Sequence, residues 1–223
     1  MRRALVAVVV GLVAAGAGRA HFAFLVPEAD GNAAKLVFSD ELAPDTKVNI
    51  DKLAATKLTL RDAAGKDLPL EFKKGDGFYL VNVPGGGPRV VYGVTEYGVL
   101  QKGDAQPFRL VYYPKALVGD VPADKAVIGG PLAVEIVPAG GSGKAKFRVL
   151  HQGKAAADVE TTVLLPGGDK KAVKTDKDGW TPEFAGTGRY GVFARVTEVK
   201  AGEYAGKTYG ETRHYATLVA DVK

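Results

Sequence analysis

The sequence predicts an all-β protein with two Ig-like or transthyretin-like β-sandwiches after an N-terminal signal peptide. From residue 21 onward, apolar and polar residues alternate with a period of two, the spacing of half-buried strands. The 29 glycines and 12 prolines interrupt helices and favour many short strands joined by turns. A hydrophobic fraction of 46% with 25% charged residues is ordinary for a globular protein and excludes disorder as the dominant state.

The first twenty residues have the order of a secretory signal peptide. Arg2 and Arg3 precede an apolar run over residues 4–15, and small residues follow it. We expect cleavage after Ala20, with cleavage after Ala17 as the alternative. Because the apolar run is short for a membrane span, we expect no integral membrane segment in the mature chain and a periplasmic or secreted location.

Export would also change the charge balance and limit the available metal ligands. The whole chain has a formal net charge of +5, and loss of the three arginines among the first twenty residues would lower it to +2. No basic stripe with interleaved aromatic residues follows, so we expect no nucleic-acid partner. The chain has no Cys, and its one Met is the initiator, so any metal must be held by nitrogen and oxygen.

The expected strands fall into two groups. The first group covers residues 21–26, 35–39, 56–61, 68–73, 78–83, 89–94 and 108–113. The second group covers residues 132–137, 146–151, 159–165, 170–175, 189–197 and 213–221. Residues 51–55 are the one segment expected to form a helical turn. Turn sequences such as PGGGP at 84–88 and LPGGDK at 165–170 separate the strands.

The segment PAGGSGK at residues 138–144 is the expected linker, because it is small, polar and without pattern. The GGP at 129–131 would serve nearly as well. The expected organisation is a signal peptide at 1–20, an N-terminal sandwich at 21–137, the linker, and a C-terminal transthyretin-like sandwich at 145–223.

Patterns that support catalysis are sparse. The two serines are Ser39 and Ser142, and Ser142 lies in the expected linker, where a nucleophile is not held in position. The glycine spacing at 186–191 matches a dinucleotide-binding motif but runs directly into an alternating strand, which favours a hairpin turn. We therefore expect the protein not to be an enzyme.

The three histidines are His21, His151 and His214. Cleavage after Ala20 would make His21 the first residue of the mature chain. Its α-amine and imidazole would then both be available to chelate one metal ion. His151 is expected to be a structural residue.

The sequence resembles the bacterial exported NikM-like family, the substrate-specific periplasmic component of nickel uptake. The residues that carry this resemblance are HFAFLVP at 21–27, YGVTEYGV at 92–99, RLVYYPKA at 109–116 and ETRHYATL at 211–218. GKAAADV at 153–159 and TDKDGW at 175–180 resemble a transthyretin-like or carboxypeptidase-regulatory-like sandwich. The family usually has a His-x-x-Trp pattern near the N-terminus, where this chain has Phe24.

This resemblance implies periplasmic handling of a divalent transition metal, with a membrane metal transporter as the further partner. It carries over to His21 and His214 as metal ligands. Glu96, Glu211 and Tyr215 are candidate further ligands, or hydrogen-bond partners of ligands. Nitrogen donors suit nickel or copper, and also cobalt or zinc, whereas magnesium and calcium prefer oxygen.

Two other functions compete with metal handling. In one, the sandwiches form a structural or adhesive module that binds a protein or glycan, and the histidines are incidental. In the other, the N-terminal histidine and a second histidine form the histidine brace of a copper oxidase, although a chain with Trp180 as its one tryptophan offers little flat aromatic surface for a polysaccharide. Stoichiometric metal binding would distinguish metal handling from the structural module. Oxidation of a polysaccharide would distinguish the copper oxidase from metal handling.

Overall fold

A computed structural model describes residues 21–141 and 143–223, and within them it confirms the all-β fold. The signal peptide expected at 1–20 and its cleavage point lie outside the described residues. The strands are β1 (Phe22–Pro27), β2 (Ala33–Ser39), β3 (Lys57–Arg61), β4 (Asp67–Leu70), β5 (Phe72–Lys74), β6 (Phe78–Asn82), β7 (Arg89–Leu100), β8 (Phe108–Val118), β9 (Val134–Gly140), β10 (Lys144–His151), β11 (Lys154–Ala155), β12 (Glu160–Leu164), β13 (Lys170–Lys174), β14 (Phe184–Ala185), β15 (Gly188–Glu198), β16 (Gly202–Tyr204), β17 (Lys207–Tyr209) and β18 (Glu211–Val222).

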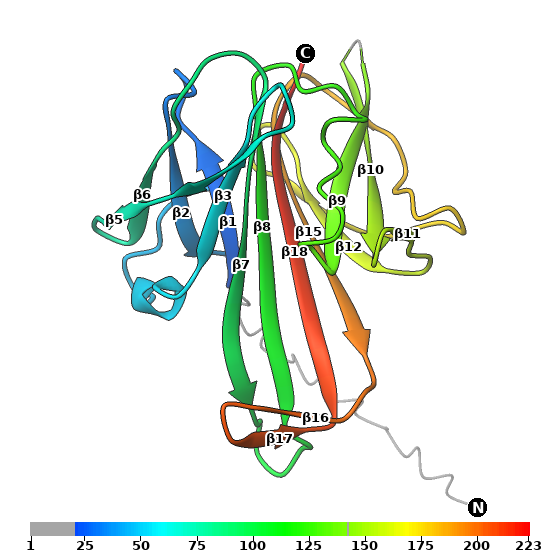
Figure 1. Cartoon of the computed structure of the whole chain (residues 1–223). Helices are drawn as coiled ribbons and strands as arrows, with labels where there is room; N and C mark the ends of the chain where they lie inside the picture. Colours follow the sequence, from blue (N-terminus) through cyan, green and yellow to red (C-terminus); the bar gives the residue numbers. More distant parts are fainter. Residues whose placement is uncertain (1–20, 142) are drawn as a thin grey trace, which may run out of the picture.

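The central element is an eight-stranded sheet in the order β13-β12-β15-β18-β8-β7-β3-β4. Its neighbouring strands are antiparallel except at the centre, where β18 runs parallel to β8 from Glu211–Phe108 to Val219–Ala116. Strands β7, β8, β15 and β18 are long and extend beyond the smaller sheets toward the β16–β17 hairpin (Figure 1). The last strand of the chain therefore lies beside a strand of its first half.

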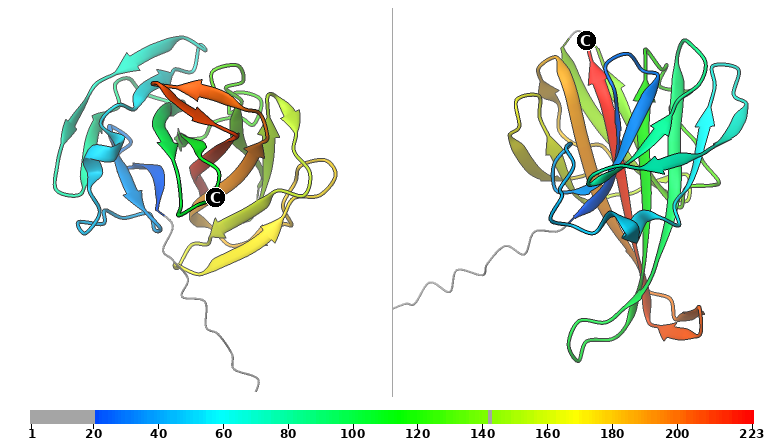
Figure 2. Two further views of the ribbon diagram at one scale, coloured as in Figure 1. Left: turned by 90° about the horizontal axis from the view of Figure 1, so that it is seen from below. Right: turned by 90° about the vertical axis from the view of Figure 1, so that its left-hand side faces the viewer.

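Two smaller sheets cover the eight-stranded sheet, one on each face. The sheet β1-β2-β6-β5 lies against one face, which we call the first face, and the hairpin β9–β10 with β11 and β14 lies against the other, which we call the second face. Figure 2 shows the two coverings on either side of the long strands. Apolar side chains fill both spaces, so the protein has two cores that share one sheet.

The alternation along β18 shows how one strand serves both cores. Tyr215 and Val219 pack in the core on the first face, whereas Ala216 and Leu218 pack in the core on the second face. Thr217 also points to the first face, where its hydroxyl donates a hydrogen bond of 2.7 Å to the carbonyl of Ala23 in β1. A period of two places consecutive side chains on opposite faces of a strand.

The segment expected as a linker forms part of a hairpin. Residues 138–140 end β9, and Lys144 begins β10, with Gly140 paired to Ala145. Gly140 has a φ of 132°, and a Cβ there would lie 2.1 Å from the carbonyl oxygen of Lys144, so the tight turn requires glycine. The small residues of this segment therefore serve a close turn. The division into two domains stays a prediction. Strands from both expected domains are hydrogen-bonded into the same eight-stranded sheet.

Two smaller expectations have different outcomes. The helical turn expected at 51–55 is a 3₁₀ helix, η1 (Ile50–Leu53), capped by the side chain of Asn49. The single strand expected at 68–73 is wrong, because β4 pairs with β3 in the eight-stranded sheet while β5 pairs with β6 in the four-stranded sheet. The chain thus passes from one layer to the other at Glu71. Within the described residues, no helix is long and apolar enough to span a membrane.

A buried ion pair ties β9 to the eight-stranded sheet. Lys115 in β8 and Glu135 in β9 are 1% and 2% exposed, and their Nζ and Oε2 atoms are 2.9 Å apart. Lys115 also donates to the carbonyl of Ala126, and Glu135 accepts hydrogen bonds from the backbone of Ile128 and Gly129. Burial lowers the pKa of Lys115, and the charge of Glu135 opposes this effect.

We expect Glu135→Leu to destabilise the fold by roughly 3–5 kcal/mol, because it leaves the buried ammonium of Lys115 unpaired. Urea unfolding of the purified protein measures this loss. Glu160→Gln is the control, since Glu160 is 69% exposed where it pairs with Arg195 and should change stability by less than about 1 kcal/mol. Equal effects of the two substitutions would contradict this account.

Candidate metal centre

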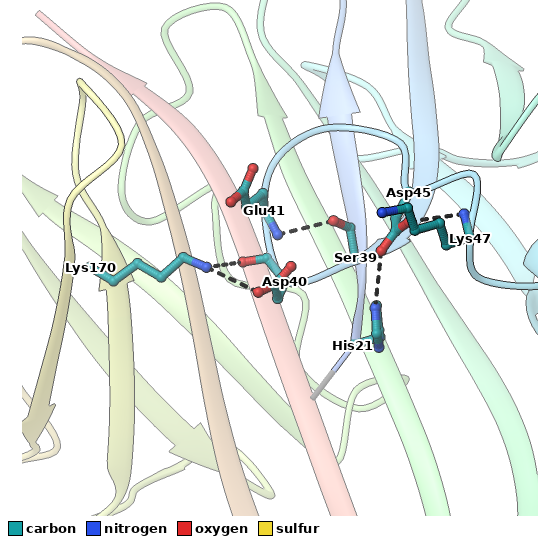
Figure 3. Close-up of polar contacts among 7 residues, drawn as sticks. All are labelled: His21, Ser39, Asp40, Glu41, Asp45, Lys47 and Lys170. Carbon is teal, nitrogen blue, oxygen red and sulfur yellow. Dashed lines mark hydrogen bonds and ion pairs between the residues drawn. The ribbon is translucent and has the colours of Figure 1, made fainter. Parts of the chain in front are cut away.

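His21 lies just before β1, against the loop that follows β2 (Figure 3). Its Nε2 is 3.2 Å from Oδ2 of Asp45, and its ring lies 5.8 Å from that of Phe38. The other oxygen of Asp45 accepts a hydrogen bond from the backbone of Lys47, which is the main cause of the lowered pKa of Asp45. Phe38 belongs to the core on the first face, so His21 lies on that side of the large sheet.

His214 lies on the second face. It is 6% exposed, and its Nδ1 is 3.0 Å from the hydroxyl of Tyr113. The preceding residue of β8, Tyr112, points to the first face and donates a hydrogen bond of 3.4 Å to the carbonyl of His21. Two consecutive tyrosines therefore contact the two histidines from opposite faces. The structure does not bring the expected ligands His21 and His214 together, because the eight-stranded sheet lies between the two imidazoles.

The structure does not place the two expected carboxylate ligands together either. Glu96 forms a two-pronged ion pair with Arg109, with a shortest distance of 2.7 Å, on the second face. Glu211 pairs with Arg213 at 2.7 Å, and Arg213 lies over the ring of Phe108 in the core on the first face. Each carboxylate therefore has an arginine partner, and the two lie on different faces.

A different group of three residues comes together on the second face. His151, Glu198 and His214 each offer one ligand atom, and these atoms all lie within 4.8 Å of one another. The Nε2 of His214 is 3.5 Å from Oε2 of Glu198, and the imidazole centroids of His151 and His214 are 6.0 Å apart. We call this group the metal-ligand cluster.

The alternation of each strand directs these three side chains inward. His151 ends β10 in phase with the buried Phe147 and Val149, and Glu198 ends β15 in phase with the buried Ala194. On β18, Thr212 lies opposite Glu198, and His214 follows it on the same face. Each of the three side chains thus occupies a position that would otherwise hold an apolar core residue.

Both imidazoles have a buried nitrogen without a hydrogen bond. The Nε2 atoms of His151 and His214 are buried and lack a hydrogen-bond partner among the described residues. Buried polar atoms are usually hydrogen-bonded, and exceptions are informative. Two of the three such atoms among the described residues therefore lie in the cluster beside the carboxylate of Glu198, and the third is Nε of Arg89.

The electrostatics of the cluster keep His214 available as a ligand. Burial lowers the pKa of His214, and the neighbouring charges of His151 and Arg109 act in the same direction. Glu198 opposes them by favouring the imidazolium. Burial also raises the pKa of Tyr113, so that its phenol stays protonated at neutral pH. Burial therefore favours the neutral imidazole of His214, the form that binds metals.

The donor set of the cluster indicates the chemistry that it can support. Two imidazole nitrogens and one carboxylate oxygen suit divalent transition metals. For bonds of about 2.0 Å, ligand atoms around a tetrahedral ion lie roughly 3.3 Å apart, so the most distant pair of ligand atoms would need to close by at most about 1.5 Å. Glu198 has a side chain that is 34% exposed and lies at the end of its strand, so it has the freedom to move.

The comparisons with known proteins supply no family. No family model and no curated protein matches the chain. Among solved structures, it is similar to the crystal structure of a pullulanase from Anoxybacillus sp. LM18-11, with 17% identity over 85% of this chain and 27% of that chain. The TM-score of 0.19 is too low for this likeness to support any conclusion about fold or function.

Sequence reasoning missed His151 and Glu198 as members of the cluster. The signal that could have found them is their position in the alternation of each strand, since both are titratable residues at inward positions of strands that are otherwise apolar on that side. This alternation alone does not show that the ends of β10 and β15 meet at one point. His214 is the one expected ligand that lies in the cluster.

We expect the metal-free protein to lose stability as the pH falls below about 6.5. The unfolded chain takes up a proton on His214 near that pH, whereas the folded protein resists protonation because burial lowers the pKa of His214. The stabilisation is complete above the unfolded pKa and is lost as the pH falls toward the folded one. Urea midpoints at pH 7.5 and 5.5 measure this loss. His214→Gln should reduce the difference between the two midpoints, and an unchanged difference would assign it to other groups.

Proposed function

We propose that this chain is an exported metal-binding protein that holds a divalent transition metal between His151, Glu198 and His214. The observation that carries the proposal is the pair of buried imidazole nitrogens without hydrogen bonds beside a carboxylate. A bound cation would satisfy all three groups at once. A purely structural role for the histidines would leave Nε2 of His151 without a partner and Nε2 of His214 with only the 3.5 Å contact to Glu198, which costs free energy.

Nickel, copper, cobalt and zinc are the metals that fit this donor set. Imidazole nitrogen is a ligand of each of them, whereas calcium and magnesium favour sites made of oxygen. The absence of Cys removes the thiolate ligands that select Cu(I). Among these ions copper should bind most tightly in vitro, following the general affinity order, and the resemblance to a nickel-uptake family favours nickel as the physiological ion.

The uneven burial of the three ligands supports reversible binding and release of the ion rather than permanent retention. The side chain of His214 is 7% exposed, whereas that of Glu198 is 34% exposed. The ion would therefore enter and leave on the side of Glu198. We propose a periplasmic or secreted carrier that has no catalytic activity of its own and passes its ion to a membrane metal transporter.

Neither competing function has an observation of comparable weight. A histidine brace would need His21 and a second histidine around one copper ion, and the two other histidines lie on the far face of the sheet, in the metal-ligand cluster. An adhesive module would not need two unpartnered imidazoles in the protein interior. Metal titration therefore decides between the proposal and the adhesive alternative.

The purified protein should bind one Ni(II) or Zn(II) ion per chain, as measured by isothermal titration calorimetry. His151→Ala and His214→Ala should each weaken binding by at least about 100-fold, because each removes one of three direct ligands. His21→Ala is the matched control and should bind like the wild type, since His21 lies across the sheet. If His21→Ala alone lost binding, the site would be the N-terminal histidine and the proposal would fail.

An extra residue before His21 should leave the affinity for Ni(II) unchanged. The cluster uses side chains alone, so it does not require the α-amine that cleavage after Ala20 would expose. Proteins that begin at residue 18, residue 21 or one added residue should give the same titration curves. A markedly tighter curve for the protein that begins at His21 would show that the α-amine chelates the ion.

A further inference from the structure

Within the described part of the chain, Tyr113 makes the one side-chain hydrogen bond to a side chain of the metal-ligand cluster. Its hydroxyl lies 3.0 Å from Nδ1 of His214, and the two rings are stacked at 5.8 Å with an interplanar angle of 24°. Tyr113 is 6% exposed and packs in the core on the second face. The orientation of the His214 imidazole is therefore set by one buried hydrogen bond and one ring contact.

A neutral imidazole carries one proton, on Nδ1 or on Nε2, and the surroundings decide which nitrogen holds it. Without a metal, a proton on Nε2 would face the carboxylate of Glu198 at 3.5 Å, which is favourable. Nδ1 would then accept the hydrogen bond of the Tyr113 hydroxyl. A proton on Nδ1 would instead direct the Nε2 lone pair at a carboxylate, which is unfavourable when no cation lies between them.

A metal ion reverses this preference. Binding through Nε2 requires the lone pair of that nitrogen, so its proton must leave to solvent. The imidazole stays neutral if a second proton arrives from solvent at Nδ1. Nδ1 then donates a hydrogen bond, and its partner must accept one. A phenol oxygen can do both, because it has one proton to donate and lone pairs to accept.

We propose that Tyr113 is a positioning residue that holds His214 in both states and reverses its hydrogen bond, from donor to acceptor, when a metal binds. This inference rests on the proposed function. A carboxylate at this position would accept a hydrogen bond from Nδ1 in both states and would add a negative charge beside the ion. The phenol supports the release of the ion as well as its binding, because the metal-free imidazole keeps a hydrogen bond of its own.

The proposal is tested by nitrogen NMR of ¹⁵N-histidine-labelled protein, with Zn(II) as a diamagnetic probe. In the metal-free protein, His214 should carry its proton on Nε2. With one equivalent of Zn(II), the proton should be on Nδ1 and the Nε2 signal should shift on coordination. A proton on Nδ1 before metal addition, or on Nε2 after Zn(II) binding through Nδ1, would overturn the switch.

Tyr113→Phe tests the positioning role separately. It should weaken Zn(II) binding by about tenfold to hundredfold, as expected for loss of a hydrogen bond to a ligating histidine. Tyr112→Phe is the matched control, because Tyr112 is the next residue of the strand, is 5% exposed and points to the first face. It should change the affinity less than about twofold. Equal affinities of the wild type and Tyr113→Phe would overturn the role of Tyr113.

The two proposals fail in distinguishable ways. If the wild-type protein does not bind Zn(II), the proposed function fails and the switch fails with it. If the wild type binds Zn(II) through His151 and His214 but the proton of His214 does not move between its nitrogens, the metal site stands and the switch alone is overturned.

Discussion

The parallel pairing of β8 with β18 is the interaction on which the rest of the structure depends. It joins a strand from the middle of the chain to the last strand, so that both halves contribute to one sheet. Parallel neighbours need a long connection, and here that connection is the whole chain from β9 to β17. With β8 and β18 at the centre, the sheet has two faces to cover, and each half of the chain supplies one covering layer.

This arrangement assigns opposite environments to consecutive residues of the central strands. Tyr112 and Tyr113 in β8 belong to different cores, as do Tyr215 and Ala216 in β18. The metal-ligand cluster lies where β10, which covers the second face, and β15 both end. The cluster is therefore enclosed by the hairpin on one side and open along Glu198 on the other. A site for an exchangeable ion needs both enclosure for affinity and a way out.

Two groups of buried polar residues on the second face show the difference between a structural and a binding role. Lys115 and Glu135 satisfy one another and the surrounding backbone, and they leave no buried atom without a partner. His151 and His214 do not satisfy one another, and their Nε2 atoms have no hydrogen-bond partner among the described residues. A complete network stabilises a fold, whereas buried polar atoms without partners call for an explanation, which the proposed ion would supply.

The sequence by itself determined the fold class, most of the strands and one residue of the candidate metal site. Period-two alternation and turn residues are local properties, so they located strands and turns without knowledge of what each strand contacts. The resemblance to an exported family pointed to His214 and paired it with His21. Only the tertiary structure decided the partners of His214, because ligation depends on which strand ends meet and on which face. His21 and His214 were separated by the sheet itself, a barrier that strand assignments do not reveal. His151 and Glu198 come from strands that reach the same point only after β9–β10 folds over the sheet, and their positions in the sequence carry no record of that contact.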